Sequence, residues 1–136
     1  MVRPAVLYGS ECWPTKATNE RQLHAAEMRM LRGMCGVTRM DRVRNEYIRG
    51  SLKVAPVSEK LRGNRLSWYG HVMRRNESHV VRKVMSMNVD GYSGRGRPKK
   101  RWMDCVKVDM VRKNVTCEMT ADRRVWKKKT CCADPK

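Results

Sequence analysis

Two glycines interrupt a long helical pattern in the middle of the chain, and they constrain what can pack against it. Over residues 58–75 the apolar positions recur at helical spacing, with Leu66 and Tyr69 at i and i+3 of one face. Gly63 and Gly70 lie inside this pattern. A helical glycine either permits a close packing partner or lets something large lie against the backbone. We therefore expect a helix here that is approached closely, by the fold itself or by a ligand.

The same spacing rule predicts helices elsewhere in the chain. We expect helices over residues 19–34, 44–52, 98–110 and 121–129, and either a helix or a strand over residues 80–87. The predicted apolar face over residues 19–34 consists of Leu23, Ala26, Met30 and Met34. Pro98 suits the first turn of its helix, because no backbone N–H is needed there. Residues 2–13 are short and broken at Gly9, and we expect them to be extended.

These elements predict an all-α fold: a small, loosely packed helical bundle with an extended N-terminal segment and a basic Gly-rich linker. Residues 1–89 would form a helical segment, residues 90–97 the linker, and residues 98–136 a C-terminal helical basic tail. Loose packing is expected because the chain has no Phe and 11 Met. Methionine is a flexible side chain that specifies a core poorly.

The charge of the chain points to a polyanionic partner. Lys and Arg number 31 against 13 Asp and Glu, which gives a formal net charge of +18. Nucleic acid is the leading candidate for such a surface. No apolar run approaches the roughly 20 residues that span a bilayer, and the basic residues are not gathered on one amphipathic helix. We expect neither a membrane nor a small molecule as partner, and a nuclear or cytoplasmic location.

Neither the cysteines nor the acidic residues are spaced for a metal or for catalysis. The six cysteines include no Cys-x-x-Cys pair, and no His lies within ten residues after any of them, so we expect free thiols and no cofactor. Asp104 and Asp109 would point to different sides of a helix, as solvated partners of nearby Lys and Arg. His71, beside Trp68 and Tyr69, is expected to be a packed or helix-end histidine. This chain alone is not expected to be an enzyme.

The segment Gly94–Trp102, "GRGRPKKRW", allows three interpretations. Arg95 and Arg97 could enter a narrow A/T minor groove as an AT-hook, with Pro98 holding the chain extended. The stretch "PKKR" is also similar to a short nuclear import signal. Alternatively, Pro98 begins a helix whose first amides and basic flank bind phosphates of any sequence.

Basic residues interleave with aromatic residues at several places, a mixture that suits a nucleic-acid backbone with stacked, unpaired bases. We expect the Trp side chains to belong to the core, because each falls on an apolar stripe, and the cations to be functional, because a plain surface mixes both signs. The predicted contacts are Lys60, Arg62, Arg65, Arg74, Arg75, Arg95, Arg97, Lys99, Lys100 and Arg101.

Five blocks of sequence carry a resemblance that covers nearly the whole chain. They are "VLYGSECW" at 6–13, "AAEMRMLRGMCGVTRMDRVRNEYIRG" at 25–50, "KLRGNRLSWYGHVMRR" at 60–75, "GRGRPKKRWMDCVKVDM" at 94–110 and "DRRVWKKKTCCADPK" at 122–136. In this order they resemble the C-terminal tail of LINE-type (non-LTR) retrotransposon polyproteins, in the part that follows the reverse transcriptase palm.

The resemblance implies a piece of a multidomain protein that copies its own RNA into DNA at a nicked target site. This piece would lie at the thumb and beyond, contacting template RNA, the RNA–DNA hybrid or target DNA, and it would contain neither the polymerase metal site nor the endonuclease. Its ends match a 5′-truncated copy or an isolated open reading frame. Two alternatives stay open: a separate DNA-binding module that uses the AT-hook, and a remnant without a function that binds polyanions because it is basic.

Overall fold

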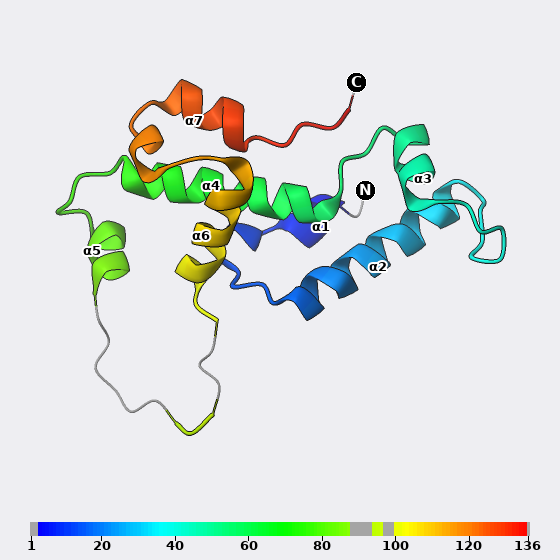
Figure 1. Ribbon diagram of the computed structural model, residues 1–136, viewed down its shortest axis with the longest axis horizontal. Coiled ribbons are helices and arrows are strands. Elements are labelled where there is room, and N and C mark those ends of the chain that lie inside the picture. The colour runs from blue at the N-terminus through cyan, green and yellow to red at the C-terminus, as the bar shows by residue number, and fades with distance from the viewer. Residues whose placement is uncertain (1–2, 88–93, 97–99, 136) are drawn as a thin grey trace.

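The computed structural model describes residues 3–87, 94–96 and 100–135. Within these ranges the chain forms helices and no strand, so the predicted all-α fold class is confirmed. The elements are α1 (Arg3–Leu7), η1 (Ser10–Cys12), α2 (Ala17–Met34), α3 (Asn45–Ser51), α4 (Val57–Met73), α5 (Val80–Ser86), α6 (Trp102–Lys113), η2 (Cys117–Thr120) and α7 (Arg123–Thr130) (Figure 1). Residues 80–87, for which the sequence allowed either a helix or a strand, contain the helix α5.

Helix α4 is the element around which the others are arranged, and η1, α2, α6 and α7 all pack on it (Figure 1). The main core cluster consists of Leu66, Tyr69, Val106, Val115 and Trp126. Two of these residues belong to α4, and the other three come from α6, the loop after it, and α7. The predicted segments 1–89 and 98–136 therefore share one core.

The two glycines of α4 are contact points for α7. A Cβ atom on Gly70 would lie 2.2 Å from Nε1 of Trp126, and one on Gly63 would lie 3.0 Å from the carbonyl oxygen of Thr130. The indole of Trp126 crosses the helix at Gly70, and its N–H donates to the carbonyl of Leu66 at 2.9 Å. Of the two expected roles for these glycines, close packing by the fold itself is the one observed.

Helices α2 and α3 form a second cluster that consists of Met28, Leu31 and Ile48. The predicted apolar face of α2 is wrong in its orientation, since Met34 is 73% exposed. The helix instead turns inward the carboxylate of Glu27, which pairs with Arg49 at 2.9 Å and accepts from the backbone N–H of Val57 at 3.3 Å. The ion pair with Arg49 offsets the free-energy cost of burying this charge. The inward face of α2 therefore includes a charged residue, which the spacing of its apolar residues could not predict.

The expectation of an extended N-terminal segment is also wrong. Residues 3–12 form α1 and η1, and Gly9 joins them with a left-handed backbone (φ +68°) that glycine adopts without a steric cost. Ser10 is fully buried against α4, and the indole N–H of Trp102 donates to the carbonyl of Glu11 at 2.7 Å. The segment is thus tied to both α4 and α6.

Candidate nucleic-acid interface

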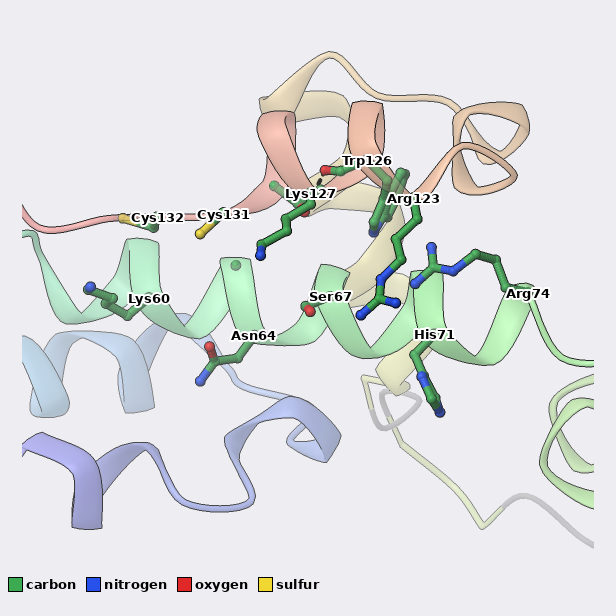
Figure 2. A pocket seen from close by; sticks show the side chains of 12 residues that line it. Lys60, Asn64, Ser67, His71, Arg74, Arg123, Trp126, Lys127, Cys131 and Cys132 are labelled. Carbon is green, nitrogen blue, oxygen red and sulfur yellow. Dashed lines mark hydrogen bonds between the residues drawn. The ribbon is translucent and has the colours of Figure 1, made fainter.

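A groove of about 280 Å³ runs between α4 and α7 (Figure 2). Its lining residues are Lys60, Gly63, Asn64, Ser67, His71, Arg74, Arg123, Trp126, Lys127, Thr130, Cys131 and Cys132. Four of these side chains are permanent cations, and none of the twelve is acidic. A concave surface lined by one sign of charge attracts counter-ions, and here the counter-ion would be an anion.

Helix α4 supplies one wall of the groove. Lys60, Ser67 and Arg74 follow one another at seven-residue intervals, close to two helical turns each, so they lie in a line along the helix. The fourteen steps from Lys60 to Arg74 correspond to about 21 Å at 1.5 Å per residue. Each end of this line is held in place: Nζ of Lys60 lies 3.1 Å from Oδ2 of Asp134, and Nη1 of Arg74 donates to the carbonyl of Thr120 at 3.1 Å.

Helix α7 supplies the other wall. Because Trp126 faces inward and is only 2% exposed, its neighbours Arg123 and Lys127 lie at the edge that faces α4. The start of α7 is fixed by Asp122, whose carboxylate accepts from two backbone N–H groups at 2.8 and 3.2 Å. Figure 2 shows Lys127 reaching toward α4, and the guanidinium groups of Arg123 and Arg74 pointing toward one another.

The charges in the groove are only partly neutralised by the protein. Among the described residues, Arg123 and Lys127 form no ion pair with any carboxylate. Two guanidinium groups that converge without an acid between them repel each other, and a bound anion would remove this repulsion. Arginine forks match the oxygens of a phosphate particularly well, because they can donate two parallel hydrogen bonds.

A second hollow of about 330 Å³ adjoins the groove, lined by Glu11, Asn64, Ser67, Trp68 and His71. Three of these residues also line the groove, so the two spaces meet on the outer ridge of α4. The ring of His71 is stacked on that of Trp68, with centroids 5.4 Å apart and planes 16° apart. His71 is exposed rather than packed in the core, and its Nε2 lies 3.2 Å from Nη2 of Arg75.

Two of the predicted nucleic-acid contacts are interior residues instead. Arg65 is 1% exposed, and its guanidinium donates to Asp109 at 2.8 Å and to the hydroxyl of Thr15 at 2.7 Å. Arg62 is 9% exposed, pairs with Glu59 of the same helix, and has its Nε 3.7 Å from Oδ1 of Asp109. The description of Asp109 as a solvated residue is wrong, since it is 3% exposed and burial raises its pKa above the ordinary value despite the nearby arginines. These arginines join α4 to α6, so we remove them from the candidate interface.

The remaining predicted contacts fall into two groups. Lys60 and Arg74 lie in the groove, and Arg75 contacts His71 at its edge. The other group belongs to the segment 94–101, of which the described members do not line the groove.

Within that second group, Arg95 is exposed, while Arg97 and Lys99 lie outside the described residues. Nζ of Lys100 donates to the carbonyl of Thr15 at 3.1 Å. The backbone N–H of Arg101 donates to Asp104 at 2.9 Å, and α6 begins at the next residue, Trp102. Pro98, the predicted first residue of this helix, lies outside the described residues.

Arg123 and Lys127 were not among the predicted contacts, although they are two of the four cations of the groove. The sequence does contain a signal for them, because the two cations are spaced i and i+4 on either side of Trp126. When the Trp side chain points inward, two residues at these positions lie at the edge of the helix. The sequence does not show that this edge faces the cations of α4, because that depends on how α4 and α7 pack.

A wider hollow of about 1180 Å³ beside α2 is also lined by cations, Arg29, Arg32 and Arg39, and by no acid. The described chain as a whole offers no metal-site chemistry. Its residues include no group of three or more His, Cys, Asp or Glu side chains that could hold a metal ion. The six cysteines are free thiols. Within the described ranges, every helix is too short or too polar to cross a membrane.

The fold and the groove define a small all-α domain built on one central helix, with a carboxylate-free cationic groove on its surface. The chain is 29% identical over 140 residues to a Caenorhabditis elegans protein described as an uncharacterized transposon-derived protein. That alignment covers 93% of this chain and 50% of the nematode protein, so the chain spans about half the length of the relative that it matches. No family model matches the chain, and no solved structure matches it. The similarity supports an origin in a transposon.

Proposed function

We propose that this chain is the nucleic-acid-binding C-terminal part of a non-LTR retrotransposon reverse transcriptase, without the catalytic palm and the endonuclease. The similarity to a transposon-derived protein supports the first half of this proposal. The ordered blocks of sequence that resemble the tail of LINE-type polyproteins support the narrower assignment. In this role the chain is not an enzyme; it would hold template RNA, the hybrid or target DNA for a polymerase elsewhere, in the nucleus or the cytoplasm.

One observation carries the nucleic-acid part of the proposal: the groove between α4 and α7 has four cations and no carboxylate. In a chain of net charge +18 a basic surface is expected anywhere, but a plain solvated surface mixes both signs. Here Arg65 and Arg62 are buried and paired with acids, whereas Arg123 and Lys127 line a concave surface without an ion pair among the described residues. Such a distribution favours binding over mere solubility.

A titration by fluorescence anisotropy tests the proposal. The purified chain is titrated into a labelled RNA hairpin, an A/T duplex and a G/C duplex at about 50 and about 200 mM salt, the range over which phosphate contacts lose affinity steeply. We expect binding at the lower salt, a fall of at least about tenfold at the higher salt, and no preference for the A/T duplex.

Two outcomes would contradict the proposal. Absence of binding to all three nucleic acids at the lower salt would exclude it. A clear A/T preference that disappears in Arg97→Ala would replace it with the AT-hook module.

A further inference from the structure

We infer that the groove and the adjoining hollow together bind a single, unpaired strand, with its phosphates against Arg74, Arg123 and Lys127 and a base stacked on His71. This inference rests on the proposed function and specifies the form of nucleic acid. The two spaces meet along the outer ridge of α4, where Asn64, Ser67 and His71 line both. A strand that crosses the ridge there would have its backbone on one side and a base on the other.

The chemistry of the two sides differs in the way that such a strand requires. The charged side chains of the groove are all cations, whereas the hollow is lined by one acid, Glu11, by Trp68, and by the His71 ring that both spaces share. A carboxylate repels phosphates and accepts hydrogen bonds from base amino groups. The outer face of the stacked His71 ring offers a base the same platform that aromatic side chains offer in single-strand-binding proteins.

The ridge between the two sides is low. Along this face of α4 the surface position is Ser67, whose small side chain is exposed. A small residue here allows a sugar–phosphate backbone to lie close to the helix, with room for a turn toward the hollow. The bases of a duplex are already paired and stacked, so a duplex offers no base to His71 and could use only the cations of the groove.

The first test separates the groove from the general charge of α7. The double variant Arg123→Gln/Lys127→Gln removes two cations that line the groove, and Arg124→Gln/Lys128→Gln removes two cations of the same helix, at the same spacing, that do not line it. Both variants are titrated into a labelled strand of about 12 nucleotides, within the usual site size for single-strand binding. We expect the first variant to bind at least about tenfold more weakly and to show a salt slope smaller by about 1.4, and the control to change far less.

The second test concerns the base. We expect His71→Ala to weaken binding of the strand about fivefold or more, His71→Phe to restore most of the loss, and a strand of abasic sites to bind wild type and His71→Ala equally. A duplex of the same length should bind more weakly than the strand and should not respond to His71→Ala.

The outcomes distinguish the inference from the function on which it rests. If the duplex binds as tightly as the strand and His71→Ala changes neither, the single-strand inference is wrong while nucleic-acid binding stands. If the two double variants weaken binding equally, the groove is not the site. If no nucleic acid binds at all, both the inference and the proposed function fail.

Discussion

Gly70 sets how closely α4 and α7 can approach each other. A Cβ atom at this position would lie 2.2 Å from Nε1 of Trp126, so no side chain fits unless the indole moves. Movement would break the 2.9 Å hydrogen bond from the indole to the carbonyl of Leu66 and leave a buried donor without a partner. One methyl group at this position therefore disturbs both the core and the wall of the groove.

We expect Gly70→Ala to lower the free energy of unfolding by about 1 to 3 kcal/mol, the usual cost of overpacking a core. Urea denaturation followed by Trp fluorescence measures this. Gly50→Ala is the matched control: Gly50 lies in α3 with nothing within 4 Å of a Cβ, so alanine there should raise the stability by about 0.5 to 1 kcal/mol. Equal stability of the two variants would show that Trp126 does not pack against Gly70.

At the scale of elements, α4 and α6 are joined by an ion pair that responds to acid. Nζ of Lys113 lies 2.8 Å from Oε2 of Glu59, and this contact holds the pKa of Glu59 below its ordinary value, with Arg62 contributing in the same direction. A carboxyl group with a lowered pKa stabilises the fold above its ordinary pKa, and this stabilisation is lost as pH falls through the folded-state value.

We therefore expect Glu59→Gln to be less stable than wild type at pH 7 and to lose less stability between about pH 5 and about pH 3. The measurement is the free energy of unfolding in urea across this range. Burial raises the pKa of Asp109, which gives it the opposite dependence, but Asp109 is present in both proteins and cancels in the comparison. Glu46→Gln, an exposed acid on α3, serves as control, and an identical pH profile for the two variants would contradict the role of Lys113.

Element positions were predictable from the sequence to the extent that each depends on local spacing. The helix predicted over residues 58–75 is α4 (Val57–Met73), because the helical spacing of its apolar positions is a local signal. The inward face of α2 was not predictable, since it depends on the pairing of Glu27 with a residue of α3. The same holds for the groove. Its α4 wall was predictable because it is a line of residues along one helix, whereas its α7 wall was not, because it depends on the contact between Trp126 and Gly70.

At the scale of the whole molecule, the main core joins residues from both sides of the predicted linker. Leu66 and Tyr69 precede the predicted linker, and Val106 and Trp126 follow it. The second cluster around Ile48 is joined to α4 through the bond from Val57 to Glu27.

We expect thermal unfolding to be a single transition, with the same midpoint by far-UV circular dichroism, which reports all helices, and by near-UV circular dichroism, which reports the packed aromatic rings. The variant Ile48→Ala should shift both midpoints together, although Ile48 lies outside the main core that holds the aromatic rings. Separate midpoints would show that the α2–α3 pair unfolds by itself. A broad change without a transition would fit a decayed remnant of the transposon.

The contact between Gly70 and Trp126 also has a consequence for the history of this sequence. Any nucleotide change that replaces Gly70 introduces a side chain where there is no room, whereas the open surroundings of Gly33 and Gly50 tolerate one. Copies that multiply without any need for the folded domain will accumulate substitutions at all three codons at the same rate. Copies whose spread depends on the folded domain will retain a glycine codon at position 70 and vary at the other two. Natural selection on this fold would therefore be easiest to detect at a residue that has no side chain.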